Sequence, residues 1–250
     1  MFALRLSVAL SLAAAPSFAA EDTWVYVNPG FSWLTAEQTS GTQAPSSFTA
    51  ATIRSAGVRA GKALGAWTIE GSAEFDRFSV DTQNDGTPVT LDYRGHRLNL
   101  DVLRRAFSDY GPLKITGYGR LGLGTFTMPL LDGEGSAELA RVKQTTLNLG
   151  FSAASYVAPR TRVTASIRWM PALSTSNTTQ PGRADVKGGI NFGFSGGVQY
   201  LFPTQWSVGF FGSWQTAQAS GILAGNDGTL GAGDLSSTMG SLQIHAGYQF

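Results

Sequence analysis

Apolar and polar residues alternate with a period of two along most of the chain after its first twenty residues. In the run WTIEGSAEFD, for example, Trp67 and Ile69 share one face, whereas Thr68 and Glu70 share the other. This period is typical of β-strands, in which successive side chains point to opposite sides. No segment keeps an apolar stripe at helical spacing for three turns. The pattern therefore predicts an all-β protein.

The connections between the predicted strands alternate between short and long. Tight turns fit at residues 62–65, 108–111, 158–161 and 202–205. Longer stretches rich in Gly, Ser, Thr, Asn and Asp fit at roughly 36–50, 81–88, 129–141, 174–187 and 218–236. This alternation predicts an antiparallel up-and-down meander of about ten strands, with eight or twelve as alternatives. Because an open meander leaves two edges unpaired, we expect it to close into a barrel.

Three features favour a membrane barrel, with the apolar face outside, over a soluble barrel or sandwich. Charges of both signs lie in the middle of the polar faces, as Glu70 and Arg120 show. The strands are about 10–15 residues long, which suits tilted strands that cross a bilayer. Aromatic residues gather near the strand ends, where interfacial belts are found. The candidate belt residues are Trp24, Trp33, Trp67, Trp169, Tyr200, Phe202, Trp206 and Trp214.

The chain begins MFALRLSVALSLAAAPSFAAED, which has the features of a secretory signal peptide. Arg5 supplies the positive charge, residues 6–15 form a short apolar core, and Ser17 and Ala19 give a small-x-small cleavage site. The apolar run is too short for a transmembrane helix. We therefore expect residues 1–19 to be a signal peptide and residues 20–250 to form one transmembrane β-barrel domain.

The last ten residues, SLQIHAGYQF, alternate up to a terminal Phe. The apolar positions are Leu242, Ile244, Ala246, Tyr248 and Phe250. This ending resembles the C-terminal assembly signal of Gram-negative outer-membrane β-barrel proteins. The resemblance implies an integral outer-membrane protein surrounded by lipid and lipopolysaccharide. It also implies recognition by periplasmic chaperones and the barrel-assembly machinery.

The stretch GYGRLGLG contains the pattern G-x-G-x-x-G of dinucleotide-binding turns in Gly117, Gly119 and Gly122. That motif requires a helix after the glycines and an acidic residue about twenty positions later. Here the glycines lie within a strand pattern, and no helix follows. We expect Gly117 and Gly119 to face lipid, and Gly122 and Gly124 to relieve crowding in the lumen. The sequence therefore predicts no cofactor.

The polar faces of the strands bring twelve ionisable residues into the predicted lumen. They are Arg59, Glu70, Glu74, Asp76, Arg97, Asp101, Arg105, Lys114, Arg120, Arg162, Arg168 and His245. Charges in such a narrow interior need partners or water, so one interpretation is a plugged lumen held by ion pairs. This interpretation predicts a structural or surface-interaction protein. The alternative is a small channel that prefers anions, because the basic residues outnumber the acidic ones.

An outer-membrane enzyme is the third hypothesis. Omptin-type proteases resemble this chain in predicted strand number and use Asp and His near the extracellular rim. Neither His96 nor His245 has their Asp-x-His spacing, and a lipid A-modifying enzyme would need His96 beside Ser or Asp. We therefore expect no catalytic residues and no metal site.

Composition narrows the range of partners. The chain has 18 basic and 17 acidic residues, so it lacks the basic excess that a nucleic-acid partner requires. It has no cysteine, which excludes disulfides and Cys-based metal sites. The oligomeric state does not follow from the sequence.

Overall fold

A computed structural model describes residues 23–39, 46–84, 87–130, 140–177, 184–224 and 230–250. The predicted signal peptide lies outside the described residues. The described chain is almost entirely strand. The elements are β1 (Thr23–Gln38), β2 (Ser46–Leu64), β3 (Trp67–Asn84), β4 (Thr87–Tyr110), β5 (Ile115–Leu130), β6 (Ala140–Ala158), β7 (Thr161–Asn177), β8 (Ala184–Gly188), β9 (Ile190–Leu201), β10 (Trp206–Ala224) and β11 (Leu230–Gln249).

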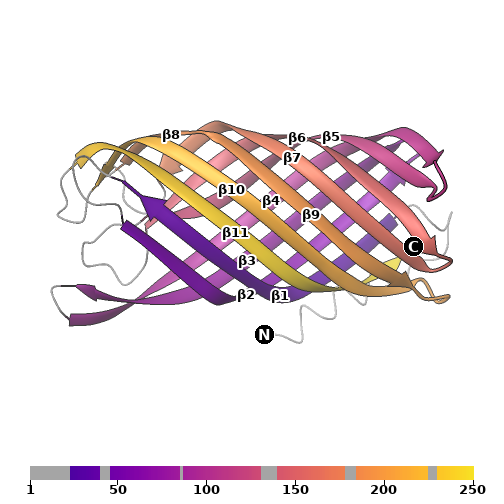
Figure 1. Ribbon diagram of the computed structural model, residues 1–250, viewed down its shortest axis with the longest axis horizontal. Helices are drawn as coiled ribbons and strands as arrows, with labels where there is room; N and C mark the ends of the chain where they lie inside the picture. Colours follow the sequence, from indigo (N-terminus) through magenta and orange to yellow (C-terminus); the bar gives the residue numbers. More distant parts are fainter. Residues whose placement is uncertain (1–22, 40–45, 85–86, 131–139, 178–183, 225–229) are drawn as a thin grey trace.

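These strands form one closed antiparallel barrel (Figure 1). Each strand from β1 to β7 pairs with the next, and β11 pairs with both β10 and β1. The segments β8 and β9 pair with successive parts of β10 and together occupy one position in the wall. Between them, Gly189 accepts a hydrogen bond from the Ala172 N–H and donates one to the Gln218 carbonyl. The wall therefore has ten positions, as the alternation of short and long connections predicts.

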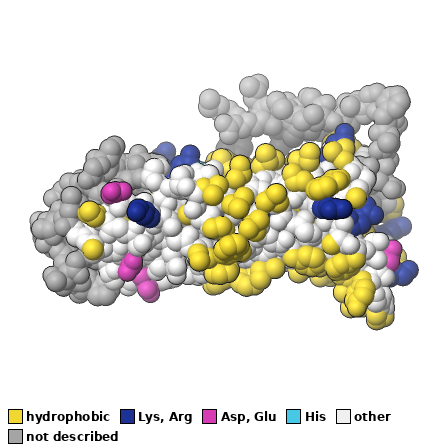
Figure 2. Space-filling view, turned by 90° about the horizontal axis from the view of Figure 1, so that it is seen from above, with side chains coloured by type: hydrophobic (Ala, Val, Ile, Leu, Met, Phe, Trp, Pro, Cys, Tyr) yellow, Lys and Arg dark blue, Asp and Glu magenta, His cyan; other side chains and the backbone are white. Residues whose placement is uncertain are grey.

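Alternation along each strand sends apolar side chains outward. In β9, Phe192 and Phe194 are 45% and 48% exposed, whereas Asn191 between Ile190 and Phe192 is fully buried. Figure 2 shows the resulting broad band of apolar side chains on the outer surface, with fewer at the end on the left. A band of this kind is what a barrel presents to lipid.

The strands are longer than we expected from the sequence. They reach 24 residues in β4, and β10–β11 pairing continues to Ala224↔Leu230, inside a predicted loop. The Gly-, Ser- and Thr-rich stretches were predicted as loops because these residues are common in turns. Here their backbones continue the sheet ladder beyond the apolar band. This end of the barrel lies opposite the four short turns.

The outer part of the β3–β4 hairpin leaves the barrel wall. Pairing between β3 and β4 continues to Asn84↔Thr87, but β2–β3 pairing ends at Arg54↔Arg77 and β4–β5 pairing at Arg97↔Phe126. Residues 78–84 and 87–96 therefore form a two-stranded ribbon, seen at the lower left of Figure 1. The base of this ribbon is tied to β5, because the Tyr93 hydroxyl donates to the Thr127 carbonyl at 2.9 Å.

Candidate functional site in the barrel lumen

The middle of the lumen holds a buried ion-pair network that joins four neighbouring strands. Arg120 on β5 contacts Glu70 on β3 at 3.1 Å and also pairs with Asp101 on β4. Glu70 in turn pairs with Arg59 on β2 at 2.6 Å. The Asn148 side chain on β6 donates to the Asp101 carboxylate at 3.1 Å. Each carboxylate of the network thus has at least one cationic partner, which buried charges require.

Gly122 makes room for this network. It lies opposite Asp101 in the β4–β5 ladder, and a Cβ at this position would collide with the Asp101 carboxylate and the Leu100 carbonyl. A Cβ at Gly119 would meet no atom within 4 Å. The glycine pattern of β5 is therefore part of a strand. A Cβ at Gly117 would meet the rings of Phe107 and Phe151, whereas a Cβ at Gly122 would also meet backbone atoms.

A second charged cluster lies farther along the same strands. Arg97 pairs with Glu74 at 2.6 Å and approaches Asp76 at 3.4 Å. Ser32 on β1 donates to the other Asp76 oxygen at 2.9 Å. This cluster ties β1 to β3 and β4 across the interior.

The remaining predicted lumen residues do not join these clusters. Among the described residues, Arg162 and Arg168 on β7 have no carboxylate within ion-pair distance. Lys114 lies in the β4–β5 turn at the rim of the lumen, with a φ of 48°. Arg105 is exposed and donates to the Gly65 carbonyl of the neighbouring turn at 2.9 Å, so its placement in the network was wrong. Its position on β4 lies beyond the end of the network.

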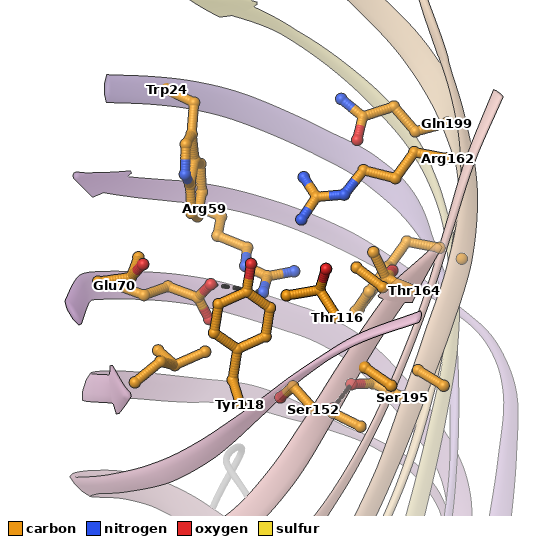
Figure 3. Close-up of a pocket in the computed structure, with 18 of the residues that line it drawn as sticks. Trp24, Arg59, Glu70, Thr116, Tyr118, Ser152, Arg162, Thr164, Ser195 and Gln199 are labelled. Carbon is orange, nitrogen blue, oxygen red and sulfur yellow. Dashed lines mark hydrogen bonds and ion pairs between the residues drawn. The ribbon is translucent and has the colours of Figure 1, made fainter. Parts of the chain in front are cut away.

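A cavity of about 440 Å³ opens at the end of the barrel that carries the short turns (Figure 3). Arg59, Arg162 and Tyr118 line it together with a wall of hydroxyl side chains. The hydroxyl residues include Thr116, Ser152, Thr164, Ser166 and Ser195. Short turns of outer-membrane barrels are periplasmic, so the cavity faces the periplasm.

Trp24 lies inside the barrel rather than in the outer aromatic belt. Its ring stacks on Tyr26 with centroids 4.9 Å apart, and the Arg59 guanidinium lies 5.5 Å from its centroid. Trp24 has the same inward-facing parity as Tyr26 and Asn28. It was predicted to belong to the outer belt because it lies near a strand end. The other predicted belt residues have exposed side chains on the outer face: Trp33, Trp67, Trp169, Tyr200, Phe202, Trp206 and Trp214.

The outer half of the lumen is filled by apolar side chains, which the sequence interpretation missed. Leu34, Leu130, Val142 and Leu223 are fully buried, and Leu235 is 1% exposed. All of them except Leu34 belong to one packed cluster, which also contains Phe126, Met128, Val186, Ala217 and Ala219. The signal was present, because Phe126, Met128 and Leu130 continue the inward parity of Arg120. We had assumed that inward-facing positions are polar along the whole barrel.

The two histidines lie on opposite faces of the barrel wall. His96 is on the outward face of β4, opposite in direction to Arg97. His245 is buried in the lumen, with its ring centroid 3.8 Å from that of Tyr26, and no described residue forms a hydrogen bond with its Nε2. On the protruding ribbon, hydrogen bonds from Ser79 and Arg77 lower the pKa of Asp92. Within the described ranges, no three acidic or His residues converge on a metal-sized site.

Comparisons with known proteins identify related folds only. No protein-family model and no curated protein matches the chain. The outer-membrane protease OmpT of Escherichia coli is similar in structure, with a TM-score of 0.59 at 9% identity over 95% of this chain and 99% of OmpT. The outer-membrane protein OprG of Pseudomonas aeruginosa has a TM-score of 0.40 at 11% identity, covering 92% and 97% of the two chains. For Ail, the attachment invasion locus protein of Yersinia pestis, the TM-score is 0.34 at 11% identity, covering 92% and 100%.

The closed barrel, its apolar outer band and its likeness in fold to OmpT define the class. The chain is an integral outer-membrane β-barrel protein of the Gram-negative type. In the part of the chain that the structure describes, there is no helix that could cross a membrane.

Proposed function

We propose that this protein is a closed outer-membrane barrel that acts through its external surface and does not conduct ions. The layer of fully buried apolar side chains across the outer half of the lumen is the observation that carries this proposal. An apolar layer opposes the passage of a hydrated ion, and two buried polar side chains at its level, Gln144 and Asn191, are hydrogen-bonded to each other at 2.9 Å. The ion pairs beneath it add a second barrier, because their charges are already neutralised by one another.

Conductance of the refolded protein in planar bilayers tests this proposal. We expect folded, heat-modifiable barrels to give no stable current steps. A matched pair of variants sharpens the test: Met128→Gly opens the apolar layer, whereas Leu123→Gly removes a comparable side chain from the lipid-facing surface. Stable steps from the wild type would overturn the proposal.

A small anion-preferring channel is the second candidate, and the periplasm-facing cavity is what favours it. The luminal arginines Arg59, Arg97, Arg120, Arg162 and Arg168 outnumber the luminal carboxylates Glu70, Glu74, Asp76 and Asp101. If the barrel conducts, Arg120→Glu should reduce its preference for anions over cations. Reversal potentials in a salt gradient measure that preference.

The proposed role is not catalytic. This is supported by the positions of His96 on the outer wall and His245 in the lumen, neither of which has a carboxylate hydrogen-bond partner among the described residues. Incubating the refolded protein with a peptide library and with lipid A should leave both unchanged by mass spectrometry. Cleavage that disappears in His96→Ala would contradict this.

We further propose that export removes residues 1–19 and that the C-terminal residues guide assembly. The Phe250 N–H donates to the Thr23 carbonyl at 2.8 Å, and its ring packs against Tyr248. The intact mass of the protein from outer membranes should correspond to a chain that starts at Ala20. Deletion of Phe250 should lower the amount of folded barrel in the membrane, as heat-modifiable migration would show.

A further inference from the structure

Charges in the described lumen are segregated by strand. The luminal carboxylates are on β3 and β4, and they pair with Arg59, Arg97 and Arg120 on β2, β4 and β5. Arg162 and Arg168 lie on β7, whose described neighbours in the wall, β6 and β9, contribute no luminal carboxylate. The β7 side of the interior therefore carries a surplus of positive charge.

Arg162 contributes part of this positive charge to the lining of the cavity. Figure 3 shows its guanidinium pointing into the cavity beside Gln199, which is its cross-strand partner on β9. The Gln199 side chain donates to the Tyr26 hydroxyl at 3.1 Å, and Gln249 donates to the same oxygen at 3.3 Å. With both donors in place, the Tyr26 O–H is available to donate toward the cavity.

Arg59 gives the opposite side of the cavity a fixed shape. Its guanidinium lies between the rings of Trp24 and Phe211, at 5.5 Å and 5.4 Å from their centroids, while it pairs with Glu70. This arginine is therefore held and neutralised. Arg162 differs, because no carboxylate among the described residues pairs with it. Its charge is left to polar neighbours and water, or to an anion from outside, and the anion would neutralise it.

We propose that this cavity binds a small anionic carbohydrate from the periplasm, either a sugar acid or a sugar phosphate. The planar fork of Arg162 matches a carboxylate or phosphate group. The hydroxyl side chains and the Gln199 amide match the hydroxyl groups of a sugar. The volume of about 440 Å³ lies within the range of ligand pockets. The apolar layer above the network makes the periplasm the side from which the ligand enters.

Isothermal titration calorimetry on the full-length refolded barrel in non-ionic detergent tests this proposal. The probes are glucuronate, glucose 6-phosphate and neutral glucose at low salt. We expect saturable binding of at least one anion, with the preferred one identifying the group, and no binding of glucose. Arg162→Gln should weaken binding by about tenfold or more, since it removes a charge-assisted contact. Arg160→Gln, which changes an exposed arginine of the adjacent turn, should leave binding unchanged.

Two controls keep the result decisive. Heat-modifiable migration and circular dichroism establish that each variant is folded, and Arg162→Lys should bind with intermediate affinity if the full replacement does not fold. In the wild type, raising the salt concentration should weaken binding. The proposal is overturned if the folded wild type binds neither anion, if glucose binds equally well, or if no change at Arg162 weakens binding.

Discussion

The outer and inner halves of the lumen share one wall but are filled in opposite ways. The outer half is packed with Leu34, Leu130 and other apolar side chains, much like the core of a soluble protein. The inner half holds Arg120 with its carboxylate partners and then opens into a hydroxyl-lined cavity. The comparison shows that alternation decides which side chains point inward, whereas the inward positions of one wall can carry apolar side chains in one half and paired charges in the other.

The largest effect should come from breaking the charged half. Arg120→Met leaves Glu70 paired with Arg59 alone and removes the cationic partner of Asp101. Loss of one member of a buried ion pair costs about 3–5 kcal/mol. Urea unfolding in lipid vesicles should show this decrease in the free energy of unfolding. Arg104→Met, which removes only an exposed contact to the Trp67 ring, is the control and should change little.

Truncation in the apolar half should cost slightly less. Leu34→Ala leaves a cavity among fully buried side chains, which lowers the free energy of unfolding by about 3 kcal/mol. The same unfolding experiment measures it. An effect below that of Arg104→Met would show that the outer half of the lumen is loosely packed and would weaken the proposed closure.

Two glycines of β5, one on each side of Arg120 in the chain, give a matched pair within the charged half. Gly122→Ala places a methyl group against the Asp101 carboxylate and the Leu100 carbonyl, and should cost about 2 kcal/mol. Gly119→Ala meets open space and should be neutral or slightly stabilising. Equal effects of the two substitutions in chemical unfolding would refute the steric role assigned to Gly122.

A smaller effect is expected at the base of the protruding ribbon. Tyr93→Phe removes the hydroxyl that donates to the Thr127 carbonyl while keeping the buried ring. The loss should be about 1 kcal/mol. Hydrogen exchange measured by mass spectrometry should show faster exchange in residues 87–96 than in the wild type, with β10 and β11 unchanged.

The smallest effect concerns pH and the exposed end of the ribbon. The pKa of Asp92 is lowered by hydrogen bonds from Ser79 and Arg77, so these contacts stabilise the ribbon above the ordinary Asp pKa. That contribution disappears as the pH falls through the lowered pKa. The protection factors of ribbon amides, which are corrected for the pH dependence of intrinsic exchange, should therefore decrease slightly on acidification. In Asp92→Asn this decrease should be absent.

Parity along the strands explains what the sequence could predict about the site. It placed Arg59, Glu70 and Arg120 on one side of the wall because side-chain direction in a strand follows from position alone. Parity does not show how far along the barrel axis a side chain lies. Arg105, near the end with the short turns, was therefore predicted to join the ion-pair network, which it does not reach. Parity also does not predict the length of the strands, because Ser- and Gly-rich segments are compatible both with loops and with hydrogen-bonded strand ends.

The apolar outer lumen was missed for a different reason. A membrane barrel is expected to be polar inside, and the lumen was therefore predicted to be polar along its whole length. Phe126 and Met128 follow the parity of Arg120 directly, so the information was in the sequence. Trp24 is a second example. Its parity places it inside the barrel, but its position near a strand end led to its assignment to the outer aromatic belt.

The location of the ion pairs also has a consequence for the order in which the barrel forms. Among the described residues, the luminal ion pairs join strands from β2 to β5, which are consecutive in the chain and need no closed ring. The contacts of Gln243 with Ser55 and of Gln249 with Tyr26 join residues 188 and 223 positions apart, across the β1–β11 junction. Local contacts form earlier than distant ones in folding chains. The charged half of the wall would therefore be assembled first, as a curved template against which the later strands are added.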